Sequence, residues 1–280
     1  MSPICVFSLL LLLWSAHLAA GEVTIFHIMP STADLCTQSL CLTDFAANSS
    51  QDLTSNTSLI LAPGNHYLSV NLTVSNLLTF KMTSSSSGTR IMCENNSFLS
   101  FDHCQSVHIT NVEFLGCGGN TFEVVDDFVL QNTRFKGRDG YHSGRALVLV
   151  ETAAQITDSF FMSSAKGTLQ DIEEVLDYDL QNVSNSMWVG GAVIATHSNI
   201  TIRHSLFESN RAQVGGALYL NLSNATIDNT TFIDNHGSEG FQECSGGNCH
   251  KNITFAGVLY QEESHVTITN SHFSLSLIHI

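Results

Sequence analysis

Basic residues are scarce in this chain: 10 Lys and Arg stand against 25 Asp and Glu, which gives a formal net charge of −15. Nucleic acid and anionic lipid surfaces are therefore poor partners, because both repel a strongly acidic protein. Cations, basic proteins and neutral glycans stay open. Charged residues make up only 12% of the chain, so Asn, Ser, Thr and attached sugars must provide most of its polar surface.

Long apolar runs are also missing, except near the start. Residues 6–13 form an apolar core broken only by Ser8, and small residues surround a cleavage point near Ala20. No Lys or Arg precedes this core, but the run is short for a membrane span. We expect residues 1–20 to be a cleaved secretory signal peptide, with a signal anchor as the alternative. The protein should then be secreted or otherwise extracellular, including the cell surface.

Metal and cofactor motifs are absent as well. The chain has no Cys-x2-Cys or His-x-x-x-His spacing and no phosphate-binding loop, so we expect no metal and no cofactor. Seven of the eight cysteines follow the signal peptide, and disulfides are their default state in a secreted protein, with a zinc site as the alternative. Two local pairs are expected, Cys36 with Cys41 and Cys244 with Cys249. The remaining three are Cys93, Cys104 and Cys117, and one of them must lack a partner.

What the chain does contain is a repeat of eighteen residues. Six blocks align without a gap: 97–114, 118–135, 144–161, 190–207, 215–232 and 256–273. Every block ends in Phe: Phe114, Phe135, Phe161, Phe207, Phe232 and Phe273. Five residues before each Phe stands an aliphatic residue: Ile109, Leu130, Ile156, Ile202, Ile227 and Ile268. Two residues after the aliphatic comes a short polar or imidazole side chain: Asn111, Asn132, Asp158, His204, Asn229 and Asn270.

A fixed period of this length is typical of a stacked solenoid. The leucine-rich alternative fails, because the blocks lack its Leu-x-x-Leu-x-Leu pattern and any helical stretch. Apolar and polar residues alternate inside the blocks, and β-branched residues are common, as in strands. We predict an all-β, single-stranded, right-handed parallel β-helix of the pectin-lyase type, with two short strands in each block. The Phe and aliphatic columns should point inward, and the Asn column should form a ladder of side-chain amides at a turn.

The repeat divides the chain into regions. Residues 21–90 should form an N-terminal segment with a first coil and cap, and residues 91–274 the β-helix. Insertions at 167–187 and 236–252 interrupt the coils; the first has the spacing of an amphipathic helix that lies on them. Loops of this kind either bind a ligand or are merely tolerated. Residues 275–280 resemble the translation of a transposase mosaic-end sequence, so we expect a sequencing artefact there. The natural chain would then continue, with a membrane anchor only in that missing segment.

Asn-x-Ser/Thr sequons are frequent, and in a secreted protein they are glycosylation sites. Nine are candidate glycosylation sites, of which we expect only some to be used: Asn48, Asn56, Asn71, Asn95, Asn182, Asn199, Asn221, Asn224 and Asn252. The tenth, Asn229, belongs to the expected amide ladder, so we predict that it is buried and unmodified.

Two kinds of short segment carry a family resemblance. The GGA(I/L/V) segments are 190–193 and 215–218, and the FxxN segments are 207–210 and 232–235. Both resemble the repeats of chlamydial polymorphic outer-membrane proteins, and that resemblance implies surface display and adhesion. Segments 61–66, 114–120 and 256–260 make the layout of residues 30–273 look closer still to secreted right-handed β-helix proteins of sponges and cnidarians. The resemblance is specific for the fold and weak for function.

Parallel β-helices often host polysaccharide lyases and hydrolases, and glycoside hydrolysis needs two carboxylates that face one groove. The candidates are Asp126 and Asp127, adjacent in one block, and Asp102 at an outer position one coil earlier. The Arg residues share no column with these acids, and the pectinase motifs are not assembled. We therefore expect a non-enzymatic extracellular β-helix for adhesion, recognition or matrix and surface presentation, with an extracellular protein or glycan as its unknown ligand. The alternative is a carbohydrate-active β-helix that binds or cleaves a polysaccharide near these acids.

Overall fold

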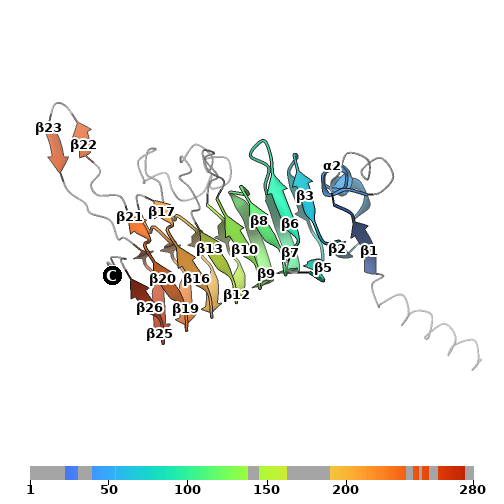
Figure 1. The fold of residues 1–280 in the computed structure, drawn as a ribbon. Helices are drawn as coiled ribbons and strands as arrows, with labels where there is room; N and C mark the ends of the chain where they lie inside the picture. Colours follow the sequence, from blue (N-terminus) through green and yellow to red (C-terminus); the bar gives the residue numbers. More distant parts are fainter. Residues whose placement is uncertain are drawn as a thin grey trace, which may run out of the picture.

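The computed structural model describes residues 23–30, 40–53, 55–86, 88–137, 145–162, 190–212, 214–237, 242–245, 248–251 and 258–274. In these residues the chain is nearly all strand and winds into a parallel β-helix, with β1 at one end of the rod and β26 at the other (Figure 1). The prediction of an all-β parallel solenoid is confirmed. The insertion at 167–187 and the segment 275–280 lie outside the described residues, as do Cys36, Asn182 and Asn252.

The coil has three faces, each a stack of parallel strands. The first face contains β4 (Leu72–Ser75), the start of β7 (Leu99–Thr110), the start of β9 (Asn120–Gln131), β11 (Leu147–Val150), β14 (Val193–Thr196), β18 (Leu218–Asn221) and β24 (Leu259–Glu262). The second face contains β1 (Val23–Ile28), β2 (Asn56–Leu61), β5 (Thr79–Ser84), the ends of β7 and β9, β12 (Ala153–Thr157), β15 (Asn199–Arg203), β19 (Asn224–Asp228) and β25 (His265–Thr269).

The third face is a separate eight-stranded sheet. It contains β3 (Asn65–Leu68), β6 (Arg90–Cys93), β8 (Glu113–Leu115), β10 (Arg134–Lys136), β13 (Phe160–Met162), β16 (Leu206–Glu208), β20 (Thr231–Ile233) and β26 (His272–Ser274). Outside the three faces, β17 (Arg211–Ala212) pairs with β21 (His236–Gly237), and β22 (Gln242–Ser245) forms an antiparallel hairpin with β23 (Asn248–Lys251). The stack therefore begins with β1, and the segment 21–90 contains five complete strands, β1 to β5, and the first residue of β6.

The prediction of two strands in each block is wrong, because a complete coil has three. At two of the corners the chain bends from one face to the next through one non-glycine residue with positive φ, the left-handed conformation. One corner is the predicted column: Asn111, Asn132, Asp158, His204, Asn229 and Asn270. The other corner had no visible turn signal, because its residues are of many types: His103, Val124, Glu151, His197, Leu222 and Glu263.

The core follows the predicted columns. From Phe114 to Phe273 the six rings stack face to face, with successive centroids 4.7, 5.3, 4.7, 4.9 and 4.7 Å apart. The aliphatic column is buried beside them from Ile109 to Ile227, and Ile268 and Phe273 in the last coil are partly buried. Burial of each large side chain contributes about 2–3 kcal/mol, so these columns are the main source of stability.

Two columns of hydroxyl groups lie at the corners, just inside the coil. At the first corner they are Thr152, Ser198, Ser223 and Ser264; at the second they are Thr133, Ser159, Ser205, Thr230 and Ser271. Each hydroxyl donates to the carbonyl two residues before it. From Thr152 and Ser159 onward, each also accepts the backbone N–H of a residue in the preceding coil, as Ser198 does from Thr152 at 3.1 Å. These ladders pair the backbone groups that the corners would otherwise leave unsatisfied.

The expected amide ladder is not formed by the Asn column, so that prediction is wrong. Asn229 is exposed, and within the column the only amide-to-amide bond runs from Asn132 Nδ2 to Asn111 Oδ1, at 2.8 Å, among the described residues. The buried ladder is formed by the last residue of the two FxxN segments. Asn210 Nδ2 donates to Asn235 Oδ1 at 2.9 Å, and both side chains are buried.

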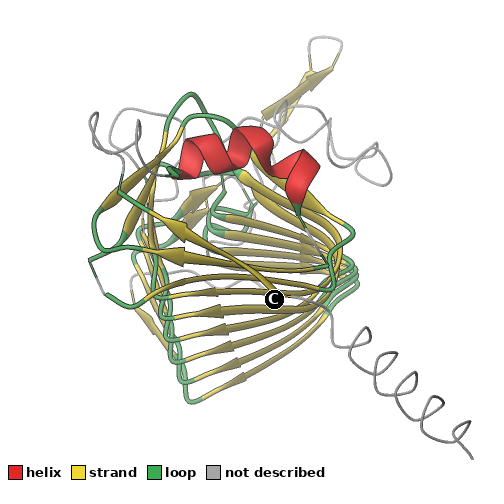
Figure 2. Cartoon of the chain, turned by 90° about the vertical axis from the view of Figure 1, so that its right-hand side faces the viewer, coloured by secondary structure: helices red, strands yellow, loops and turns green. Residues whose placement is uncertain are grey.

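The N-terminal end of the coil carries a helix, α2 (Leu42–Asp52), which lies across part of that end (Figure 2). Leu42 is fully buried, and the Phe45 ring meets Phe26 edge-on at 5.0 Å. Cys41, directly before the helix, is disulfide-bonded. The helix therefore covers apolar side chains that the first coil would otherwise expose, as expected of a cap.

Candidate functional site

A groove of about 370 Å³ lies on the outside of the second face. We call it the second-face groove. Its lining comes from five successive coils: Asp126, Asp127, Ala153, Ala154, Gln155, Asn199, Ile200, Thr201, Asn224, Ala225, Thr226 and His265. Two of the three acids singled out in the sequence, Asp126 and Asp127, therefore lie in one groove.

A change in coil length creates one end of this groove. Asn120 pairs with Leu147, 27 residues later, but Leu130 pairs with Ile156, only 26 residues later. The coil that contains β9 thus has one residue more at this corner than the next coil, and the exposed Asp126 occupies that position. The gap-free alignment of the six blocks is therefore wrong at this point. Beyond the step comes the small side chain of Ala153, which leaves the space open.

Polar groups in the groove contact each other from coil to coil. One carboxylate oxygen of Asp127, Oδ2, is 3.3 Å from His108 Nε2, and the other, Oδ1, accepts a bond from Gln155 Nε2 at 3.5 Å. Further along, Asn224 Nδ2 donates to Asn199 Oδ1 at 3.0 Å. The groove therefore presents amide, hydroxyl, carboxylate and imidazole groups in rows along the axis.

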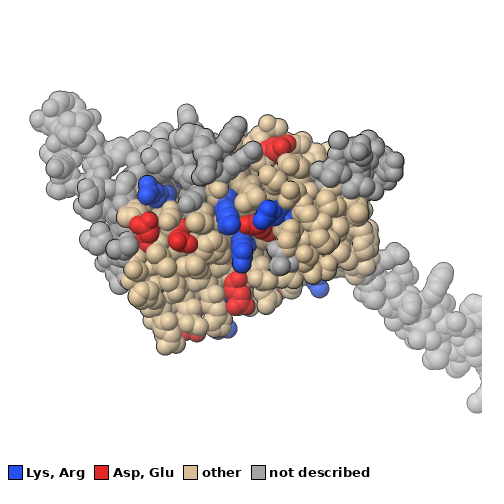
Figure 3. Space-filling view, in the orientation of Figure 1, with Lys and Arg blue, Asp and Glu red and all other residues tan. Residues whose placement is uncertain are grey.

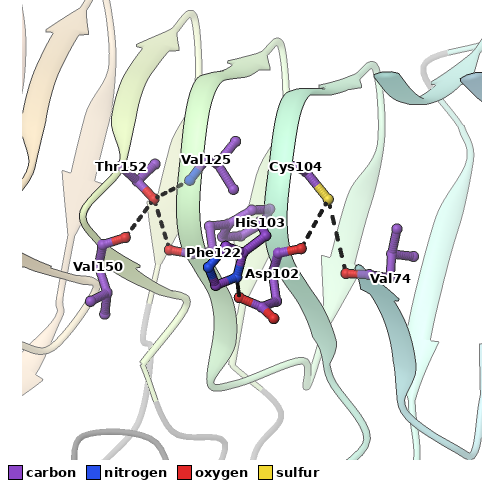
Figure 4. A network of polar contacts seen from close by, with 8 residues as sticks. All are labelled: Val74, Asp102, His103, Cys104, Phe122, Val125, Val150 and Thr152. Atoms are coloured by element: carbon purple, nitrogen blue, oxygen red, sulfur yellow. Dashed lines mark hydrogen bonds and ion pairs between the residues drawn. The ribbon is translucent and has the colours of Figure 1, made fainter. Parts of the chain in front are cut away.

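The third acid, Asp102, lies apart from the groove at the corner between the first and second faces (Figure 4). Its Oδ1 is 2.5 Å from His103 Nδ1, and its register partner in the next coil is Glu123. Burial, followed by the charges of Asp102 and Glu151, raises the pKa of Glu123 above its ordinary value. Asp102 therefore does not converge with Asp126 and Asp127, and the three predicted acids do not form one catalytic group.

Cys104 takes the place of a hydroxyl residue at the same corner (Figure 4). Its thiol is 3.5 Å from the Asp102 carbonyl and 4.0 Å from the Val74 carbonyl. Thr152 makes the same two kinds of bond, to the carbonyls of Val150 and Phe122. Burial raises the pKa of the Cys104 thiol, which favours the neutral and less reactive form.

The other cysteines agree with the expected pattern where the structure describes them. Cys93 and Cys117, from successive coils of the third face, form a disulfide with a Cα–Cα distance of 5.0 Å. Cys104 is the one of the three without a disulfide. Cys244 and Cys249 are directly opposite each other in the register of the β22–β23 hairpin.

The sequons lie mainly along two corners. Asn199 and Asn224 line the second-face groove, and Asn56 stands in the same column of that face. Asn221 is close by at the first corner, while Asn71 and Asn95 are exposed between the third and first faces. Asn48 lies in α2. Asn229, expected to be buried, is exposed at the second corner with its sequon intact. In the described residues no sequon Asn stands on a strand of the third face.

Other site types receive no support in the described part of the chain. It contains no cluster of three or more His, Cys, Asp or Glu side chains that could hold a metal ion. It also contains no helix with the length and apolarity needed to cross a membrane. No family model, curated protein or solved structure matches this chain.

Proposed function

We propose that this chain is a non-enzymatic extracellular β-helix domain that recognises an extracellular ligand, in adhesion or in matrix and surface presentation. The second-face groove is the observation that carries the proposal. Gln155, Thr201 and Thr226 occupy one position in three successive coils, and Asn199 and Asn224 occupy another. Rows repeating at about 4.8 Å suit an extended ligand whose units each meet similar groups.

The chemistry of the lining favours a neutral glycan or a polar peptide as this ligand. Amides and hydroxyls both donate and accept hydrogen bonds. Apart from His265, Asp126 and Asp127 are the only acidic or basic residues in the lining. A glycan attached at Asn199 or Asn224 would compete for the same space, since both side chains line the groove. The secretory signal peptide and the number of sequons support an extracellular setting.

Binding by the secreted protein tests this proposal. Beads coated with the protein should adhere to extracellular matrix or to immobilised neutral glycans. The variant Ala153→Trp, which fills the groove, should lose that adhesion, and Thr73→Trp, on the exposed side of the first face, should keep it. A double Asn199→Gln and Asn224→Gln variant shows whether attached sugars block the site. Adhesion that is unchanged by Ala153→Trp, or no adhesion by any variant, would refute the proposal.

One observation favours the alternative of polysaccharide cleavage: Asp126 and Asp127 share the groove, and Asp127 is paired with the His108 imidazole. A carboxylate beside an imidazole can serve in proton transfer. Release of reducing ends or unsaturated sugars from a polysaccharide would support cleavage if Asp127→Asn abolished it. Product formation of this kind would replace the recognition proposal with the enzymatic one.

A further inference from the structure

The third face carries a concentration of positive charge that the overall composition hides. Three of the ten Lys and Arg residues of the chain lie there, on the two strands that flank β8: Arg90 on β6, and Arg134 and Lys136 on β10. Figure 3 shows the basic atoms gathered near the middle of this face. We call these three residues the cationic cluster. In a chain with a net charge of −15, such a cluster needs a specific account.

A single carboxylate organises the cluster. Glu113 stands between Arg90 and Arg134 in the register of the sheet. Its Oε2 is 2.7 Å from Arg90 Nε, and its Oε1 is 3.1 Å from Lys136 Nζ. Burial alone would raise the pKa of Glu113, but the bonds from Arg90 and Lys136 outweigh it and lower the pKa. Glu113 is therefore ionised at neutral pH and holds two of the cations in place.

One carboxylate does not neutralise three cations. Arg134 is exposed and has no ion pair or hydrogen bond from its side chain within the described part of the molecule. The next carboxylate on this face, Glu208 on β16, lies two strands beyond Arg134. At the adjoining corner, Asp158 is 3.9 Å from His204. The cluster therefore keeps an excess of two positive charges, with the Arg134 guanidinium and the exposed half of Arg90 turned to solvent.

The surroundings of the cluster suit a sugar ring. Met92, Leu115 and Met162 stand in the same column as Lys136 on adjacent strands, half-buried on the outside of the sheet. Guanidinium groups bind oxyanions through paired N–H donors, and the aliphatic side chains offer a surface for C–H groups. The cations lie within about 10 Å along the axis, since strands are about 4.8 Å apart.

We propose that the cationic cluster binds a short sulfated oligosaccharide. The sulfate oxygens would accept bonds from Arg134 and Arg90, and Lys136 would provide a further charge. Length matters here, because attraction to the cluster is screened beyond about 8 Å, whereas a long polyanion would also meet the acidic remainder of the surface. This inference goes beyond the proposed function, because it concerns the third face and a negatively charged ligand rather than the second-face groove and a neutral one.

Titration with a sulfated tetrasaccharide and with its desulfated counterpart tests this inference. The glycosylated, secreted protein should bind the sulfated form only, and raising the salt concentration should weaken binding. Replacing two cations, in Arg134→Gln with Lys136→Gln, should lower affinity about ten-fold or more, as expected from loss of charge-assisted bonds. The matched control is Lys81→Gln with Arg203→Gln, which removes two exposed cations from the second face.

Three results would overturn the inference. The wild-type protein could fail to bind, both double variants could lose affinity equally, or the desulfated sugar could bind as well as the sulfated one. A different occupant has its own signature. The insertion at 167–187 contains five acidic residues: Asp171, Glu173, Glu174, Asp177 and Asp179. If binding appears only after all five are changed to amides, the occupant of the cationic cluster is this acidic segment of the chain. Unfolding midpoints of all variants show whether a loss of binding reflects a loss of folding.

Discussion

The buried amide ladder gives the sharpest test of how the coils are held together. In the variant Asn235→Leu, the backbone N–H of Asn210 loses its acceptor at 3.0 Å, and Asn210 Nδ2 loses its bond to the same oxygen at 2.9 Å. The Phe207 carbonyl loses its bond from Asn235 Nδ2, also 2.9 Å long. A buried donor without a partner costs about 1–3 kcal/mol, and each lost bond about 0.5–1.5 kcal/mol, so we expect a total loss of about 2.5–7.5 kcal/mol.

The matched control is Asn229→Leu, in a residue of the same type that is exposed at the second corner. Its φ of 46° is the left-handed conformation, which Leu222 adopts at the other corner of the same coil, so the cost should be only about 1 kcal/mol. Guanidinium unfolding followed by circular dichroism measures both free energies. Equal losses for the two variants, or a loss below about 1 kcal/mol for Asn235→Leu, would contradict the assignment of the ladder.

Three further predictions use the same unfolding assay. Phe207→Ala should cost about 3–5 kcal/mol, because the ring is fully buried between two others; a loss below about 1 kcal/mol would mean that the Phe column is not the core. Cys104→Ser should change stability by less than about 1 kcal/mol, because the hydroxyl would find the carbonyls that already face the thiol; a large loss would argue against equivalence with Thr152. Burial lowers the pKa of His66 below its ordinary 6.5, so stability should fall as the pH drops below about 6.5, where only the unfolded chain takes up this proton. His66→Gln should reduce that slope, and an unchanged slope would exclude His66 as its source.

The inward columns could be predicted because, in stacked coils, residues one period apart in the sequence lie directly above one another in the structure. A Phe every coil at the same position has one consistent place, the interior, and Phe114 to Phe273 lie there. The hydroxyl ladder was present in the same alignment, two residues before each Phe from Thr133 to Ser271. It was missed because Ser and Thr are common on exposed strands, so their residue type does not reveal burial.

The position of the amide ladder could not be derived from residue type, since Asn is suited both to a left-handed corner and to a buried side-chain bond. Asn229 and Asn235 are six residues apart and have opposite environments. The groove was equally hidden, because it depends on a step of one residue in corner length between the coil of β9, where Asp126 stands, and the next coil. A comparison of coil lengths corner by corner, rather than of whole blocks, could have found that step.

The direction of the hydrogen bonds between coils has a mechanical consequence. These bonds run along the axis of the rod, and the two ends of the described chain, Val23 and Ser274, belong to its opposite ends. A force that pulls those ends apart acts along the bonds and loads them one coil at a time, rather than shearing many together. Each coil with the 25-residue spacing of Phe207 and Phe232 would then release about 80–90 Å of chain as it peels away. Under tension such a rod should lengthen in steps at low force.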